Sequence, residues 1–519
     1  MRKSLATLAV AVTALLQFVA FPSNAGADQW TPPGVPHQIA IVDQSLFQQT
    51  SHLSANWYGN TAAVLCTEYS SSGPCQFDAQ GNFLEGQVML PACMDVVQTN
   101  CIASMSMGKS KDSLVVSTFQ RMSAGPTVNM DPQRDLPEGS TIGLWSNSLS
   151  SASGSNMYAT SVGLQLGFSN GKYTFTNLEA SVVPYSLING SEYRPITNVV
   201  NNQNSTIRSF GQDGLAYGCI WTDTGVCGHV DDFQQGTFVS MTLRLSNKIG
   251  GWFKARMKSP DIKVSTFNSS SNVIEITGQS VDVPEVAVSV PESATGLAGL
   301  WNCTNCMGYA SFGGASLQSD SGGTAGIINL IRSLANNSAS GIINIWNFGS
   351  LPAAGNSCLT STASVLGLVT TNAMAYDGSV PSFANGFLTY NVAGMHYMPD
   401  GVTPVQGTYD MVMADSVARC LYGFSNAPIS GTISVSEENG VQNVATTTVS
   451  DVGGWVHLAA YGFNFSNPVI TARLTQAAPV VIVAPAKKTT ITCVNTKNKK
   501  LIKKITAVKP VCPSGYKKV

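Results

Sequence analysis

The stretch MYATSVGLQLGFSNGKYTFTNLEASVV, residues 157–183, consists of two β-rich runs joined at Asn170 and Gly171. Asn-Gly between two such runs is a strong short-range signal for a β-hairpin, because both residues suit a tight hairpin turn. We therefore predict strands over 157–168 and 172–183. An all-β fold is the expectation that follows from them.

Strand-like runs continue on both sides of this hairpin, with a spacing of about ten residues that is typical of a sandwich or barrel. In the first half they are 237–245, 252–257, 262–267, 273–277 and 281–290. In the second half they are 342–348, 387–392, 407–413, 417–424, 432–436, 442–449, 455–460 and 469–474, with a hairpin turn at 438–440. We predict tandem immunoglobulin-like β-sandwich domains with one short helix, over 327–334 and ending at Asn336 and Asn337. A disulfide-closed C-terminal β-hairpin completes the predicted fold.

A chain of 519 residues is long enough for two or three domains. Residues 1–27 combine a basic start, an apolar run and an Ala-Gly-Ala site before Asp28, which is the pattern of a secretory signal peptide. The predicted order continues with an N-terminal β-sandwich region of one or two domains (28–290), a Gly- and Ser-rich connector with the short helix (291–339), a C-terminal β-sandwich domain (340–476), a linker (477–486) and a basic hairpin tail (487–519).

The tail, KKTTITCVNTKNKKLIKKITAVKPVCPSGYKKV, contains ten lysines and no acidic residue. Removing these lysines together with Arg2 and Lys3 leaves 16 basic and 29 acidic residues over 28–486, a net charge of −13. Cross-linking Cys493 to Cys512 would stabilise the hairpin by about 3 kcal/mol in the chain-entropy model. A block of like charge is typical of an interaction segment, although it can also fold back onto its own acidic chain or remain a solvated end. We expect an anionic cell-envelope polymer to be bound by Lys487, Lys488, Lys497, Lys499, Lys500, Lys503, Lys504, Lys509, Lys517 and Lys518.

Twelve cysteines, an even number, favour disulfides in an exported protein. Nearest-neighbour spacing predicts the pairs Cys66 with Cys75, Cys93 with Cys101, Cys219 with Cys227, Cys303 with Cys306, Cys358 with Cys420 and Cys493 with Cys512. Connectivity cannot be deduced from spacing alone.

Only 11% of the residues are charged, compared with about 25% in an average soluble domain. Small neutral polar residues must therefore cover the surface, which suits an extracellular β-protein. Residues 28–486 lack the clustered Lys and Arg that phosphate neutralisation requires, so we expect no nucleic-acid partner. After the leader, no segment reaches the ~20 apolar residues of a transmembrane helix. The expected location is extracellular or at the cell surface.

Three segments carry a resemblance. The first resembles a module of large secreted actinobacterial proteins and comprises GTYDMVMADSVARCLYGF (407–424) with GGWVHLAAYGFNF (453–465). The second resembles a further piece of these proteins and is LPACMDVVQTNCIASMSM (90–107). The third, the Lys-rich tail with its CPSGYKK ending, is similar to a C-terminal segment shared by many exported proteins of these bacteria. The resemblance covers about half of the chain. It implies an exported, surface-associated β-rich protein and brings no catalytic residues, because no activity is assigned to this family.

Catalytic motifs are incomplete in this sequence. Residues 319–323, SDSGG, resemble the nucleophile segment of trypsin-like proteases, but the segment beginning Thr61-Ala62-Ala63 lacks the required histidine, and a Ser/Gly turn explains 319–323 more simply. The CTNC motif at 303–306 has no helix start to lower a thiol pKa, which favours a structural disulfide.

The five histidines are scattered without metal-binding spacing; they are His37, His52, His229, His396 and His457. His229 lies close to Cys227, Asp231 and Asp232, a group that fits either an acid/base or metal site or a disulfide-bounded polar loop. We predict no catalytic residue, cofactor or metal ligand.

The leading hypothesis is an exported surface or adhesin-like structural or binding protein, held at the envelope by its tail and contacting glycans or another surface protein. The alternative is a secreted carbohydrate-binding module or glycoside hydrolase. Sugar-stacking platforms could come from Trp145, Trp221, Trp252, Trp301, Trp346 and Trp455, although core packing is the favoured interpretation of each. A hydrolase needs two facing carboxylates, and the sequence does not pair the candidates Asp231, Asp232, Glu275, Glu437 and Glu438.

Overall fold

The computed structural model describes residues 37–41, 51–55, 64–68, 84–189, 199–200, 206–207, 219–223, 226–290, 309–312, 315–316, 328, 331–351, 355–361, 364–436, 446–465, 469–476 and 487–519. Its contacts divide the chain into two compact units. The larger unit contains β1 to β30 and all but the last residue of β31, and the smaller unit contains the C-terminal residues. The predicted signal peptide, the turn at 438–440 and the linker over 477–486 lie outside the described residues.

The hairpin predicted at Asn170 and Gly171 is present. β9 (Met157–Ser169) and β10 (Lys172–Asn189) pair antiparallel over most of their length. Asn170 has a φ of 53° and Gly171 a φ of 76°, so both turn residues adopt the left-handed backbone that a two-residue hairpin turn requires.

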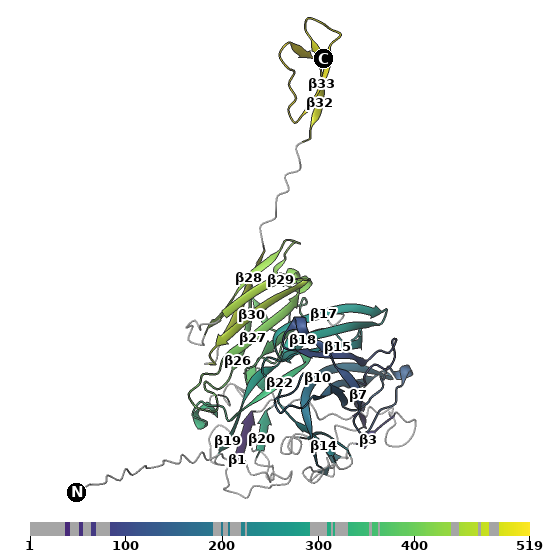
Figure 1. Cartoon of the computed structure of the whole chain (residues 1–519), viewed down its shortest axis with the longest axis vertical. Coiled ribbons are helices and arrows are strands. Elements are labelled where there is room, and N and C mark those ends of the chain that lie inside the picture. Colours follow the sequence, from purple (N-terminus) through teal and green to yellow (C-terminus); the bar gives the residue numbers. More distant parts are fainter. Residues whose placement is uncertain are drawn as a thin grey trace, which may run out of the picture. The chain divides into compact units, whose positions relative to one another are not determined.

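One large sheet extends from this hairpin in both directions (Figure 1). Its strands pair in the order β3, β2, β4, β9, β10, β22, β16, β23, β27, β30 and β29. Their bounds are β2 His52–Ala55, β3 Val64–Cys66, β4 Leu84–Met89, β16 Gly251–Arg256, β22 Gly341–Leu351, β23 Val365–Thr371, β27 Gly407–Ala414, β29 Thr446–Val452 and β30 Trp455–Phe463. Strands of the predicted N-terminal region (28–290) and of the predicted C-terminal domain (340–476) thus share one sheet.

Shorter strands attach to this sheet or lie apart from it. β8 pairs with β9, β7 with β8, β14 with β10, β13 with β14, β19 with β22, and β1 with both β19 and β20. Their bounds are β1 His37–Ile41, β7 Thr118–Met122, β8 Gly143–Ser146, β13 Cys219–Asp223, β14 Val226–Val230, β19 Val281–Val290 and β20 Tyr309–Phe312. Two short strands, β11 (Val199–Val200) and β12 (Thr206–Ile207), pair only with each other. Single 3-10 turns lie at Lys111–Ser113 and Pro132–Arg134.

Two further sheets pack on this large sheet and bury its two faces. The first has the order β17-β18-β15-β5-β6, and the second contains β21, β24, β26, β31 and β28, with β25 paired to β26. Their bounds are β5 Cys101–Gly108, β6 Val115–Val116, β15 Phe238–Ser246, β17 Lys258–Asn268, β18 Ser271–Gln279, β21 Ala315–Ser316, β24 Ala375–Tyr376, β25 Ser382–Ala384, β26 Phe387–Ala393, β28 Ile429–Ser436 and β31 Val469–Gln476.

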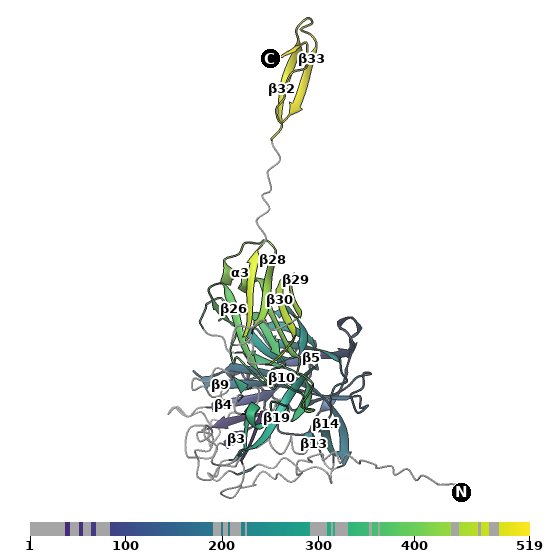
Figure 2. The ribbon, with the colours of Figure 1, turned by 90° about the vertical axis from the view of Figure 1, so that its left-hand side faces the viewer.

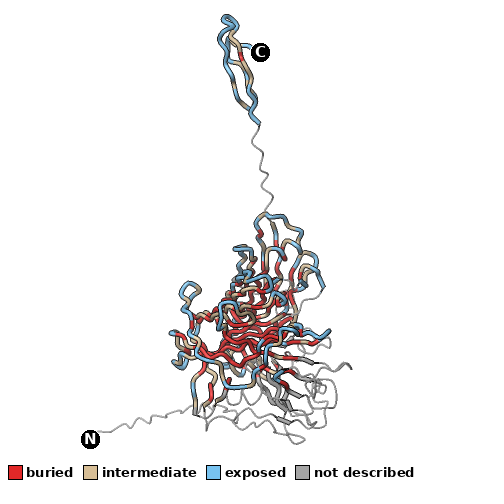
Figure 3. Tube along the Cα trace, turned by 90° about the vertical axis from the view of Figure 1, so that its right-hand side faces the viewer, coloured by how far each residue is buried: buried red, intermediate tan, exposed pale blue. Residues whose placement is uncertain are grey.

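Side chains of the large sheet point alternately to its two faces, and so contribute to two hydrophobic cores, one against each of the two further sheets. Phe253 packs with the first sheet, whereas its neighbour Trp252 packs with the second. In the same way, Val412 packs with the first sheet and Met411 with the second. Because successive strand residues point to opposite faces, a strand buried on both faces reads as a continuous apolar run. Figure 3 shows this buried interior in red. The all-β prediction is therefore confirmed, while the immunoglobulin-like topology stays a prediction.

The helix predicted over 327–334 is present in its described residues, and Ile328 and Ile331 are fully buried. Asn336 and Asn337 follow it with φ values of 48° and 63°, so the predicted stop is confirmed.

The strand predicted over 417–424 is wrong, and with it the prediction of a single helix. This segment forms helix α3 (Asp415–Tyr422), which Figure 2 shows at the same end of the larger unit as β26 and β28. Val417, Ala418 and Leu421 contact the core at helical spacing, and Gly423 ends the helix with a φ of 66°.

Candidate functional site: the basic C-terminal module

The C-terminal residues 487–519, here called the basic module, form a small antiparallel sheet. β32 (Thr489–Asn495) lies between β33 (Ile502–Ala507) and β34 (Tyr516–Lys518). The third strand, β34, was not predicted, because three residues after a Pro-Ser-Gly turn carry no alternation to detect. The hairpin is therefore one part of a three-stranded sheet.

A disulfide replaces a hydrophobic core in this module. Cys493 is fully buried and bonds to Cys512, while nearly all its neighbours are exposed or half-buried. Across β32 and β33 the hydroxyls of Thr490 and Thr506 lie 2.7 Å apart. The side-chain Oδ1 of Asn495 accepts from the backbone N–H of Lys497 at 2.9 Å and shapes the turn. Covalent closure compensates for the small apolar area that the segment can bury.

All ten lysines of the module are exposed. Register places Lys503 and Lys518 on either side of Cys493, and therefore on one face of the sheet. Lys504 lies opposite Thr492 and Lys517 opposite Val494, on the other face. Both faces consequently carry positive charge, and the module has no carboxylate side chain to neutralise it.

Aliphatic side chains are exposed between these lysines. Leu501 and Ile502 are 50% and 59% exposed beside the Lys-rich turn. The Lys503 ammonium lies 5.1 Å from the ring centre of Tyr516, which places a cation over an aromatic face. The surface therefore offers dispersed ammonium groups with apolar contacts between them, an arrangement suited to a flexible polyanion rather than to one compact anion.

Three of the predicted disulfides are present: Cys93–Cys101, Cys358–Cys420 and Cys493–Cys512. Cys66 and Cys227 are also disulfide-bonded. Their predicted partners, Cys75 and the side chain of Cys219, lie outside the described part of the chain, as do Cys303 and Cys306.

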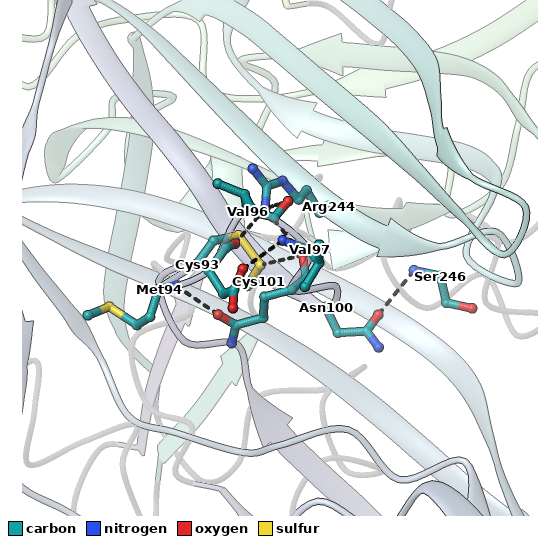
Figure 4. The surroundings of a disulfide bond; sticks show 10 residues. Cys93, Met94, Val96, Val97, Asn100, Cys101, Arg244 and Ser246 are labelled. Carbon is teal, nitrogen blue, oxygen red and sulfur yellow. Dashed lines mark hydrogen bonds between the residues drawn. A yellow bond between two sulfur atoms is a disulfide. The ribbon is translucent and has the colours of Figure 1, made fainter.

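The Cys93–Cys101 disulfide closes a surface loop that is held at several points (Figure 4). Arg244, from β15, donates through Nη1 to the carbonyl oxygens of Asp95 at 2.8 Å and Val96 at 3.1 Å. Within the loop, Gln98 Oε1 accepts from the backbone N–H of Met94 at 2.7 Å. The loop is therefore ordered before any contact with a partner.

The tip of this loop is apolar and open to solvent. Met94, Val96 and Val97 are between 72% and 78% exposed. Exposed apolar side chains on a braced loop are a feature of contact surfaces, because little ordering remains to oppose binding.

Hydrogen bonds to Asp231 organise the group of residues near His229. Asp231 accepts hydrogen bonds from the hydroxyls of Ser151 and Ser153, and its Oδ1 accepts from the backbone N–H of Asp232 at 2.8 Å. Partial burial raises the pKa of Asp231, but the hydrogen bonds from the two hydroxyls and from the backbone N–H groups of Asp232 and Ser153 together outweigh it and leave that pKa below the ordinary value. Among the described residues, no three His, Cys, Asp or Glu side chains gather where they could hold a metal ion. Asp231 thus organises the loop at Ser151.

A buried polar cluster at Asp410 was not predicted. Asp410 is fully buried in β27 and accepts from His457 Nε2 at 2.8 Å and from the Tyr461 hydroxyl. Its Oδ2 accepts from the backbone N–H of Ser259 and the hydroxyl of Thr370, each at 3.3 Å. These four donors satisfy a carboxylate that would otherwise be costly to bury.

Strand register explains why His457 and Tyr461 reach Asp410. Asp410 pairs with Ala459 across β27 and β30, so His457 and Tyr461 are its diagonal neighbours on the same face. Burial and the nearby Asp410 carboxylate raise the pKa of Tyr461. The cluster joins the bulge of β17 at Ser259 to the large sheet, and the one sequence signal for it is a charged residue within an apolar strand.

The candidate sugar platforms are mostly core residues. Trp145, Trp221, Trp252 and Trp346 are at most 5% exposed and Trp455 is half-buried, whereas Trp301 lies outside the described residues. Of the carboxylate candidates, Glu275 forms an ion pair of 2.7 Å with Lys263, and Glu437 and Glu438 are not described.

Comparisons with protein-family models, with curated proteins and with solved structures find no match to this chain. Among the described residues, no helix has the length and apolar character needed to cross a membrane.

Proposed function

We propose that this chain is an exported, surface-associated binding protein held on an anionic polymer of the cell envelope by its basic module. The supporting observation is the exposure of all ten lysines on a disulfide-closed sheet that has no acidic residue. Each lysine near an anionic surface contributes at most about 1 kcal/mol, and screening within about 8 Å reduces this. Ten such groups still provide several kcal/mol of attraction.

The larger unit is the part that such an anchor would present. Its disulfides and braced Cys93–Cys101 loop suit an oxidising exterior. The exposed tip at Met94, Val96 and Val97 is a contact surface of the kind that an adhesin-like protein needs.

The test compares the chain with and without residues 487–519, added to isolated cell envelopes at increasing NaCl. We expect the full chain to be retained at low salt and released as salt rises, and the truncated chain to remain in solution throughout. Equal retention of both forms would refute the anchoring role of the module.

A second pair of variants separates charge from fold. Replacing the ten lysines by glutamine should abolish retention while Cys493–Cys512 still forms, as a thiol assay can check. Replacing Asp112 and Asp261 by asparagine changes charge elsewhere and should leave retention unchanged.

A further inference from the structure

The two faces of the sheet in the basic module differ in what lies over them. Cys493 points to the face that also carries Lys503 and Lys518, here called face A. The disulfide places Cys512, and with it the turn that leads into β34, over this face. On the same face the Lys503 ammonium lies 5.1 Å from the ring centre of Tyr516. Face A is therefore partly covered by the module's own chain.

Burial agrees with this difference between the faces. Ile491 and Ile505 lie opposite each other on face A, and both are half-buried. One position along the same strands, Thr490 and Thr506 lie opposite each other on the other face, here called face B, and both are exposed. Face B is therefore the side of the sheet that is open to a ligand.

Face B combines cationic, apolar and hydroxyl groups. Register places Ile502 and Lys517 on either side of Val494, and Lys504 beside Thr492. Ile502 is 59% exposed, and both lysines are exposed as well. Lys504 and Lys517 are two strands and two residues apart, so their Cα atoms are separated by roughly 12 Å. Two cations thus flank a short aliphatic strip.

This pattern matches a linear polymer in which phosphate groups alternate with hydroxylated carbon segments. Two phosphates can meet the ammonium groups of Lys504 and Lys517 while the carbon segment between them lies on Ile502 and Val494. The module has ten lysines and no arginine. Arginine suits a planar carboxylate that accepts two parallel hydrogen bonds, whereas lysine serves a phosphate as a point charge. The composition therefore favours phosphate over carboxylate.

We propose that face B is the surface on which the basic module holds its polymer, and that this polymer is a polyol phosphate. The inference rests on the function proposed above and specifies its binding face and its ligand class. Lysines on face A add attraction at a distance, which salt screens within about 8 Å at physiological ionic strength. Lysines on face B act by contact.

The experiment measures binding of the full chain to immobilised poly(glycerol phosphate) at about 150 mM NaCl. Replacing Lys504 and Lys517 together by glutamine should weaken binding at least about fivefold. The matched variant replaces Lys503 and Lys518 by glutamine, which removes the same charge from the same two strands but from face A. It should weaken binding by less than about twofold, because screening limits charges that make no contact. Equal losses in the two variants would overturn the assignment of face B.

Ile502→Ser tests the contact with the carbon segments of the polymer. Binding to poly(glycerol phosphate) should weaken at least about threefold, because an aliphatic contact is lost without any change of charge. Binding to inorganic polyphosphate, which contains no carbon, should stay the same. Val511→Ser is the control, since Val511 is 78% exposed next to Cys512 and so lies away from face B. Unaltered binding of Ile502→Ser to poly(glycerol phosphate) would contradict the proposed contact.

Polygalacturonate, a carboxylate polymer, tests the ligand class. At equal charge concentration it should bind at least about fivefold more weakly than poly(glycerol phosphate), and equal binding would overturn the assignment to phosphate. The variant without the ten lysines separates this inference from the anchor. If it loses binding while the two paired variants bind equally, the anchor stands and the face assignment falls. If it binds poly(glycerol phosphate) like the unaltered protein, the anchor itself is refuted.

Discussion

Gly349 illustrates, at the scale of one residue, how a missing side chain shapes the larger unit. A Cβ at this position would lie 2.0 Å from Glu179 Oε2 and 2.9 Å from the carbonyl oxygen of Leu178, and the backbone atom cannot move away easily. We expect Gly349→Ala to lower the free energy of unfolding by about 2 kcal/mol, as overpacking does. Urea unfolding measures this.

Gly341 provides the control, because it lies in the same strand and a Cβ there would meet no atom within 4 Å. Gly341→Ala should change stability by less than about 0.5 kcal/mol. Equal losses in the two variants would mean that the close approach to Glu179 has no energetic weight.

Asp415 and Asp451 give a pH-dependent prediction. Partial burial and the neighbouring Asp451 carboxylate raise the pKa of Asp415, and the Arg419 guanidinium 3.4 Å away only partly opposes this. An acid whose pKa is raised in the folded state contributes stability at low pH that is lost as pH rises through that pKa. Asp451→Asn removes the repulsion, and its Oδ1 can still accept from the backbone N–H of Ile429.

We therefore expect Asp451→Asn to be more stable than the unaltered protein at pH 7, by about 0.5 kcal/mol after allowance for solvent screening. The difference should disappear when the pH falls to about 4, near the ordinary pKa of Asp. Thermal unfolding at several pH values measures it. Asp112→Asn, at an exposed position, controls for the loss of one negative charge, and a gain that does not vary with pH would contradict the explanation.

At the scale of elements, the Cys93–Cys101 loop should owe its order to Arg244. Removing the guanidinium deletes its hydrogen bonds to the Asp95 and Val96 carbonyls but leaves the disulfide. Arg244→Ala should speed hydrogen exchange of the loop amides at least tenfold, with little change in global stability. Arg473→Ala is the matched control, since both arginines lie over a phenyl ring. Unchanged exchange in Arg244→Ala would assign the order to the disulfide alone.

Elements with a local signal were predictable. Asn170-Gly171 determines the β9–β10 turn through backbone conformation, and Asn336-Asn337 ends a helix in the same way. α3 was mistaken for a strand because its eight residues contain a short, mostly apolar run, which periodicity alone does not assign to a helix or a strand. The useful signal was Gly423, a typical residue just after a helix end.

At the scale of the whole molecule, pairing between distant strands was not predictable. β22 lies between β10 and β16 although more than 150 residues separate it from β10 along the chain. Neither alternation nor spacing encodes which strands meet, so the shared sheet and the Asp410 cluster could not be predicted from the sequence. The basic module, in contrast, was largely predictable, because its charge and its cysteines are local.

The central claim is electrostatic attachment through that module, and its most direct test is the salt dependence of binding to an immobilised polyphosphate. Affinity of the full chain should fall steeply between about 50 and about 200 mM NaCl, because each neutralised phosphate releases counterions. The variant with all ten module lysines replaced by glutamine should bind weakly at both concentrations. Equal affinity and equal salt slope for the two proteins would contradict the account.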